Sequence, residues 1–114
     1  MKTSGPYVPN RGDIVWTNLD PRTGHEQSGR RVLVLSRELL ATRTGLMVVC
    51  PITSKAKGAP HEVPIHVSSI SGVVLPIHLR SIDYRARGAL FIARAPEQVL
   101  RNATQKASIL INGL

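Results

Sequence analysis

This chain of 114 residues has few cysteines, acidic residues and aromatic residues, and it has no long apolar run. Each of these shortages excludes a class of structure or of interaction. The single cysteine, Cys50, cannot form an intrachain disulfide and has no second cysteine with which to build a thiolate metal site. No apolar run approaches the roughly 18 residues of a membrane-spanning helix. The first residues lack the hydrophobic segment of a secretory signal, so we expect a cytoplasmic protein that makes no membrane contact.

The scarcity of acidic residues leaves a strongly basic protein. Fifteen Lys and Arg stand against seven Asp and Glu, which gives a formal charge of +8 and an isoelectric point near 10.9. Such a charge on a small domain predicts a polyanionic partner, either nucleic acid, an acidic protein or both. Aromatic residues make up only 4% of the chain, so base stacking cannot be the main source of affinity for a nucleic acid.

The pattern of short apolar runs predicts one mainly β domain over residues 1–114. Residues 1–10, rich in proline and glycine, form an irregular arm. We expect strands at 13–18, 31–36, 46–52, 61–67, 72–75, 79–82 and 89–93, and a short helical turn at 38–42. A C-terminal α-helix over 96–111 begins at Pro96 and ends before Gly113. The expected architecture is a small closed β-barrel capped by this helix.

Several residues carry more specific structural predictions. The strand that starts at Arg31 is apolar on both faces, which indicates a central strand. Pro64 favours an edge position for its strand, because proline cannot donate a ladder hydrogen bond. Cys50 is best interpreted as a small buried apolar residue, and Trp16 as part of the core. Tyr84 is then the aromatic residue better placed to stack on a base.

The segment Gly24-His25-Glu26-Gln27-Ser28-Gly29-Arg30-Arg31 concentrates a histidine, a carboxylate and two guanidinium groups ahead of an apolar strand. This combination suits the cleavage of RNA, which carries its own nucleophile in the 2′-OH beside the scissile phosphate. An enzyme must accept the proton of that hydroxyl, stabilise charge on the phosphoryl oxygens and protonate the departing 5′ oxygen. None of these steps requires a metal ion.

Five blocks in this order and spacing closely resemble the MazF/PemK toxins of bacterial toxin–antitoxin modules. The blocks are Arg11-Gly12-Asp13-Ile14-Val15-Trp16, Leu19-Asp20-Pro21, the segment from Gly24 to Arg31, Pro51-Ile52-Thr53-Ser54-Lys55, and Arg85-Ala86-Arg87-Gly88. The resemblance implies an SH3-like barrel, shared with the CcdB toxins, that forms a homodimer. It also implies a ribosome-independent endoribonuclease that cuts single-stranded mRNA at short sequences without a cofactor. Its inhibitor would be an acidic, MazE-like antitoxin.

The resemblance also assigns the catalytic residues. The arginine that ends the Glu-Gln-x-Gly-x-Arg segment is Arg31, and the threonine after Pro-x is Thr53. Arg31 would hold the phosphoryl oxygens with its planar fork, and Thr53 would donate one hydrogen bond to the same group. Antiparallel pairing of their strands could bring the two together. Glu26 is the family's acid–base candidate, and His25 competes with it because an ordinary histidine titrates nearer neutrality.

We expect further residues to bind RNA, and the sequence leaves some of their roles open. Lys55 and Lys57 would contact phosphates, or else belong to a solvated loop. Arg85 and Arg87 would grip RNA beside Tyr84, or lie at a dimer interface. The full set of expected RNA-binding residues is His25, Gln27, Arg30, Ser54, Lys55, Lys57, Tyr84, Arg85 and Arg87. The four histidines are too scattered to form a metal site, so no metal is expected.

Two departures from the family pattern leave the cleavage sequence open. Val32 stands where a proline commonly follows the arginine, and Pro76-Ile77-His78 replaces the usual Ala-Asp-Gln. Two other functions compete with RNA cleavage. A gyrase-directed, CcdB-like toxin would rely on a tryptophan near the C-terminus, whereas the single tryptophan here is Trp16. The second alternative is an RNA-binding barrel without catalysis.

Overall fold

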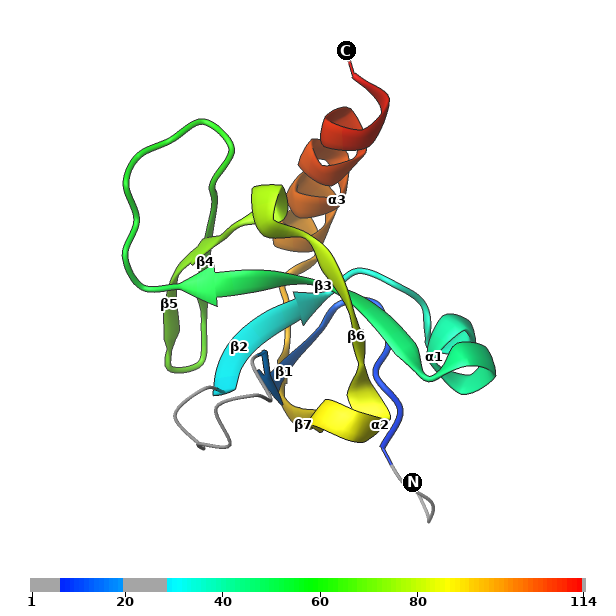
Figure 1. The fold of residues 1–114 in the computed structure, drawn as a ribbon. Coiled ribbons are helices and arrows are strands. Elements are labelled where there is room, and N and C mark those ends of the chain that lie inside the picture. The colour runs from blue at the N-terminus through cyan, green and yellow to red at the C-terminus, as the bar shows by residue number, and fades with distance from the viewer. Residues whose placement is uncertain (1–6, 20–28, 114) are drawn as a thin grey trace.

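The computed structural model describes residues 7–19 and 29–113. A curled antiparallel sheet dominates it, and a long C-terminal helix packs beside the sheet (Figure 1). Its strands are β1 (Asp13–Asn18), β2 (Gly29–Val34), β3 (Leu46–Thr53), β4 (Val63–Val67), β5 (Ile70–Val74), β6 (Arg80–Asp83) and β7 (Leu90–Arg94). Its helices are α1 (Glu38–Thr44), α2 (Tyr84–Arg87) and α3 (Glu97–Asn112), with a 3₁₀ turn, η2 (Pro76–His78).

The sheet has seven strands in the order β4-β5-β3-β2-β1-β7, and β6 pairs with β3 outside this path. Long β3 makes the curl possible, since its first half pairs with β6 and its last two residues pair with β5. Among the described residues no pairing joins β4 to β7, so the sheet is a half-barrel. This curled form is consistent with the SH3-like barrel expected from the sequence.

The expected strands and both expected helices are present, with shifted ends. Two elements were not predicted. Helix α2 forms because the Asp83 carboxylate accepts hydrogen bonds from the main-chain N–H groups of Arg85 and Ala86, as an N-cap does. Turn η2 places Pro76 in its first turn, where the missing N–H costs nothing. None of the helices in the described part of the chain is both long and apolar enough to span a membrane.

The core has two apolar clusters, one on each face of the sheet. Leu33 belongs to one cluster and Val32 to the other, so β2 is buried on both faces and central, as predicted. The prediction that Pro64 marks an edge strand is confirmed, because β4 ends the sheet. Cys50 is fully buried, also as predicted, and burial raises the pKa of its thiol to about 12.

The prediction that Trp16 lies in the core is wrong. Its side chain leaves 40% of its surface exposed, although Ile14 and Val15 on the same strand are fully buried. Trp16 pairs with Arg31 on β2 and with Leu90 on β7, and both of these residues are exposed. Helix α3 does not cover this end of the face, since it packs against β4 and η2.

Residues 7–12 form an irregular arm, as expected for this part of the N-terminal segment. The buried carboxylate of Asp13 anchors the arm to the sheet. It accepts hydrogen bonds from the Tyr7 hydroxyl, from the N–H of Asn10 at 3.1 Å and from the Arg94 guanidinium at 2.8 Å. Desolvation of the phenol and its hydrogen bond to Asp13 raise the pKa of Tyr7 above its ordinary value.

Candidate active site

Arg31 and Thr53 line one open depression, which we name the Arg31 depression. Strands β2 and β3 run antiparallel with Val32 opposite Pro51. Arg31 near the start of β2 therefore comes beside the end of β3, where Thr53 is the last residue. The depression has a volume of about 420 Å³ and is lined by Trp16, Gly29, Arg30, Arg31, Ile52, Thr53 and Ser54.

The main chain holds Thr53 from two sides. Its hydroxyl oxygen accepts a hydrogen bond from the N–H of Lys55 at 3.1 Å. Behind it, Gly72 of β5 approaches so closely that a Cβ there would lie 2.1 Å from the Thr53 carbonyl oxygen. Gly72 therefore lacks a side chain because Thr53 occupies the space. Half-buried and paired with Val73, Thr53 is a fixed group in the wall of the depression.

A second hollow, the lysine depression, lies on the other side of Thr53. It has a volume of about 460 Å³ and is lined by Thr53, Lys55, Lys57, Ala59, His61, Glu62, Leu75, Ile77 and His78. Both lysines are exposed, and Ile77 and His78 belong to η2, where the sequence departs from the family. The lysine depression and the Arg31 depression share Thr53 and together form a continuous basic surface.

The loop that carries the two lysines is internally bonded. The Glu62 carboxylate accepts hydrogen bonds from the N–H of Lys57, at 3.0 Å, and from that of Gly58, also at 3.0 Å. Lys106 of α3 donates to the carbonyl of Pro60 at 2.7 Å. The loop is therefore attached both to its own base and to the C-terminal helix. The negative charge of Glu62 is directed toward main-chain amides rather than toward a bound polyanion.

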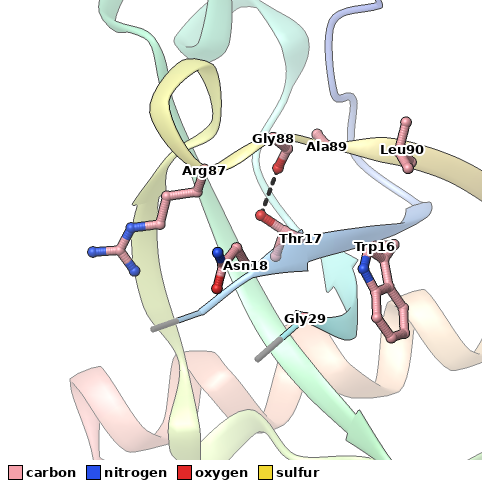
Figure 2. Close-up of a pocket in the computed structure, with 8 residues that line it drawn as sticks. All are labelled: Trp16, Thr17, Asn18, Gly29, Arg87, Gly88, Ala89 and Leu90. Carbon is pink, nitrogen blue, oxygen red and sulfur yellow. Dashed lines mark hydrogen bonds between the residues drawn. The ribbon is translucent and has the colours of Figure 1, made fainter. Parts of the chain in front are cut away.

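A third hollow, the Arg87 depression, shares Trp16 and Gly29 with the Arg31 depression. Figure 2 shows the residues that line it. It has a volume of about 260 Å³ and is lined by Trp16, Thr17, Asn18, Gly29, Arg87, Gly88, Ala89 and Leu90. The Thr17 hydroxyl donates to the carbonyl of Gly88 at 2.5 Å. The Arg87 guanidinium donates to the carbonyl of Leu19 at 2.8 Å, which fixes its position at the end of β1.

Two expected RNA-binding residues lie elsewhere. The Arg85 guanidinium stands 5.6 Å from the ring centre of Tyr84, and a Cβ built on Gly45, the residue before β3, would lie 3.3 Å from it. Thr53 is at the other end of that strand, eight residues long. The structure therefore does not bring Tyr84 or Arg85 to the Arg31 depression. Their binding roles stay predictions, separate from this site.

Three expected site residues, His25, Glu26 and Gln27, lie outside the described residues. Within residues 7–19 and 29–113, no three His, Cys, Asp or Glu side chains gather as a metal site would require. Because His25 and Glu26 lie outside the described residues, their roles as proton carriers stay predictions. The described part of the site supplies cationic side chains and hydrogen-bond donors.

Sequence reasoning missed three residues that shape the site. Trp16 was assigned to the core, although its position opposite Arg31 on a neighbouring strand would have placed it at the site once the register was known. Glu62 and Gly72 carried no signal, since a lone glutamate in a loop and a glycine in a strand are common. Their roles depend on contacts that only the folded chain defines.

Comparison with known proteins identifies the family to which the chain is similar. Residues 10–111 match the family described as PemK-like, MazF-like toxins of type II toxin–antitoxin systems. The endoribonuclease toxin MazF of Escherichia coli strain K12 is 37% identical over 106 residues, covering 92% of this chain and 96% of that protein. The endoribonuclease toxin ChpB from the same strain is 37% identical over 108 residues, covering 89% of this chain and 92% of ChpB.

Solved structures agree with this assignment. A crystal structure of MazF from Deinococcus radiodurans superposes with a TM-score of 0.84 at 46% identity, covering 93% of this chain and 98% of that one. A chain of a MazE–MazF crystal structure from the same organism gives a TM-score of 0.83 at 42% identity, covering 93% and 97%. The chain described here belongs to the family of PemK-like and MazF-like toxins of type II toxin–antitoxin systems.

Proposed function

We propose that this protein is a toxin that cleaves single-stranded mRNA without a metal ion, using Arg31 and Thr53. The observation that carries the proposal is that these two residues line one depression from adjacent strands. The relatives are named endoribonuclease toxins, which favours RNA cleavage over a gyrase-directed toxin or a non-catalytic barrel.

The reaction would begin with attack of the ribose 2′ oxygen on the adjacent phosphorus. A P–O2′ bond forms and the P–O5′ bond breaks, so the products are a 2′,3′-cyclic phosphate and a 5′-hydroxyl. In the transition state, negative charge grows on the phosphoryl oxygens. The Arg31 guanidinium would bind two of these oxygens, and the Thr53 hydroxyl would donate a hydrogen bond to the same group. The Lys55 N–H already holds the hydroxyl oxygen, which helps to orient its proton.

Proton transfer needs one group to accept the 2′-OH proton and another to protonate the departing 5′ oxygen. Glu26 or His25 would accept the first proton. An arginine is a poor proton carrier because its pKa lies above about 12 in water, so Arg31 acts first as an electrostatic stabiliser. This division of roles predicts that the cleavage rate depends on the positive charge of residue 31 and not on proton transfer to or from that residue.

The charges around the site fit a polyanionic ligand. Arg30 and Arg31 line the Arg31 depression, and Lys55 and Lys57 line the lysine depression. In the described part of the chain, Glu62 is the one carboxylate that lines any of the three depressions, and it accepts hydrogen bonds from main-chain amides. Among the residues that the structure describes, a single strand of RNA would therefore meet no uncompensated negative group on this surface.

Two protein partners complete the proposal. An acidic, MazE-like antitoxin would inhibit the toxin by laying its tail over the same basic surface, in line with the chain's charge of +8. A second copy of the chain would form a homodimer. Exposed apolar side chains at the end of α3, Ile109, Leu110 and Ile111, leave surface that a second copy could cover.

The test is to incubate the purified protein with single-stranded RNA in excess EDTA and to identify the product ends. We expect cleavage to persist and to leave 2′,3′-cyclic phosphate and 5′-hydroxyl ends. Loss of cleavage that added Mg²⁺ restores would contradict the metal-independent reaction. Tight binding with intact RNA, with or without Mg²⁺, would instead support a non-catalytic binder.

A further inference from the structure

Trp16 is the exposed exception on a buried strand. On β1, Val15 is fully buried and Thr17 is nearly so, whereas Trp16 leaves 40% of its surface in contact with solvent. Indole has a large apolar face, and folding does not remove this one from water. The exposed face of the indole is therefore available to a ligand or a partner.

The sheet register places this indole beside the proposed catalytic arginine. Trp16 is the paired residue of Arg31 on β2. Directly paired residues of antiparallel strands project from the same face, and neighbouring strands lie about 5 Å apart. The aromatic face and the guanidinium are therefore adjacent groups on one surface.

Trp16 also separates two hollows. It lines both the Arg31 depression and the Arg87 depression, so its side chain is their shared wall. Figure 2 shows the indole at one side of the Arg87 depression and the Arg87 side chain at the other, with Asn18 between them.

Strand β2 has a glycine, Gly29, where the indole ring of Trp16 lies against it. A Cβ on Gly29 would lie 2.3 Å from the indole Nε1 atom, so the backbone of Gly29 lies directly against the ring. A ring packed along one edge against a strand loses little further freedom when a flat ligand covers its exposed face. Such a ring is suited to stacking.

We propose that Trp16 stacks on a base next to the scissile phosphate of single-stranded RNA, and that the Arg87 depression receives that nucleotide. The inference rests on the proposed ribonuclease function. Arg31 would hold the scissile phosphate, the indole would hold the neighbouring base, and Arg87 would meet the next phosphate. Aromatic stacking tolerates any base, so Trp16 supplies affinity and position rather than sequence selection.

The emission of the protein reports on this one position, because Trp16 is the only tryptophan in the chain. The probe is a single-stranded 2′-O-methyl RNA of mixed sequence, which lacks the attacking hydroxyl, and its control is an oligomer of the same length with abasic sugars. We expect the base-containing oligomer to quench the tryptophan emission and the abasic oligomer to leave it unchanged. Anisotropy of labelled oligomers measures binding independently.

Substitutions separate stacking from apolar packing. We expect Trp16→Leu to weaken binding of the 2′-O-methyl RNA about 5- to 100-fold, and Trp16→Phe to weaken it less. Phe91→Leu is the matched control, because Phe91 is 49% exposed but pairs with Val15 and so projects from the opposite face. Denaturation midpoints of all three variants establish that they fold.

The outcomes divide clearly. RNA that binds and is cleaved while the tryptophan emission stays constant overturns the stacking proposal and leaves the proposed function intact. Binding by Trp16→Leu equal to that by Phe91→Leu also overturns it. Emission that shifts with protein concentration in the absence of RNA shows instead that a second copy covers the indole. A wild-type chain that neither binds nor cleaves RNA overturns both proposals.

Discussion

Gly72 of β5 lies against the main chain of Thr53, with space for a hydrogen atom but not for a methyl group. A Cβ at position 72 would lie 2.1 Å from the Thr53 carbonyl oxygen and 2.9 Å from its carbonyl carbon. The position of a proposed catalytic hydroxyl thus depends on a residue that has no side chain.

We therefore expect Gly72→Ala to displace Thr53 and to lower kcat by about 100-fold, as misplacement of a reacting group by about 1 Å can do. Overpacking should also reduce the free energy of unfolding by about 1–3 kcal/mol. Ser71→Ala, at the exposed neighbouring position, is the control and should change neither quantity. Steady-state kinetics and urea unfolding give both values. If the Gly72→Ala enzyme kept the wild-type kcat, the main chain around Thr53 would have adjusted to the added methyl group, and the close approach of Gly72 would not position the hydroxyl.

Glu62 provides a test in which charge and geometry predict opposite results. Replacing it by alanine raises the net positive charge, which alone would strengthen RNA binding. It also removes the acceptor that holds the N–H groups of Lys57 and Gly58, so the loop loses its fixed shape. We expect geometry to dominate and KM to rise about 2- to 10-fold, the range that the net contribution of a typical hydrogen bond gives when water replaces the lost acceptor.

The control for this experiment is Glu97→Ala, which makes the same change in charge on the exposed first turn of α3. Its KM should fall slightly or stay constant. If Glu62→Ala binds RNA as tightly as Glu97→Ala does, then the hydrogen bonds to Lys57 and Gly58 do not position the loop.

Cys50 links stability to alkaline pH. Burial raises the pKa of its thiol to about 12, whereas an unfolded cysteine titrates near 8.5. Between these values the unfolded chain releases the proton first, so the free energy of unfolding should decrease as pH rises, by up to about 1.4 kcal/mol per pH unit. Unfolding of the wild type and of Cys50→Ala by urea between pH 8 and 10 measures the difference, and the variant should lack this part of the slope.

The same burial predicts that a thiol reagent at pH 8 modifies Cys50 only when the chain unfolds. Rapid labelling of the native protein, at a rate independent of its stability, would contradict the burial of the thiol.

Much of the fold could be predicted from the sequence because its strands and long helix are determined by local patterns of apolar residues. The alternation and length of apolar runs predicted the strands. The helical spacing of Val99, Leu100, Ala103, Ala107 and Leu110 predicted α3, in which Leu100, Ala103 and Ala107 are buried but Leu110 is exposed. Helix α2 and the 3₁₀ turn η2 were missed, since each is only about one turn long and depends on a single capping or proline residue.

The proximity of Arg31 and Thr53 could also be predicted, since they lie in recognisable blocks near adjoining ends of neighbouring strands, whereas their catalytic roles stay predictions. Trp16 was misassigned because its surroundings depend on register and on where α3 packs, and neither is a local property of β1. The same limit applies to Tyr84, whose separation from Thr53 follows from the length and direction of β3.

The central claim concerns the guanidinium of Arg31, and the most direct measurement is the single-turnover rate of RNA cleavage in EDTA by Arg31→Ala. Arg101→Ala, an exposed position on α3, is the control for loss of one positive charge. We predict that Arg31→Ala folds with an unchanged denaturation midpoint and cleaves at least about 100-fold more slowly, while Arg101→Ala cleaves at the wild-type rate. A folded Arg31→Ala protein that cleaves RNA at the wild-type rate would contradict the account.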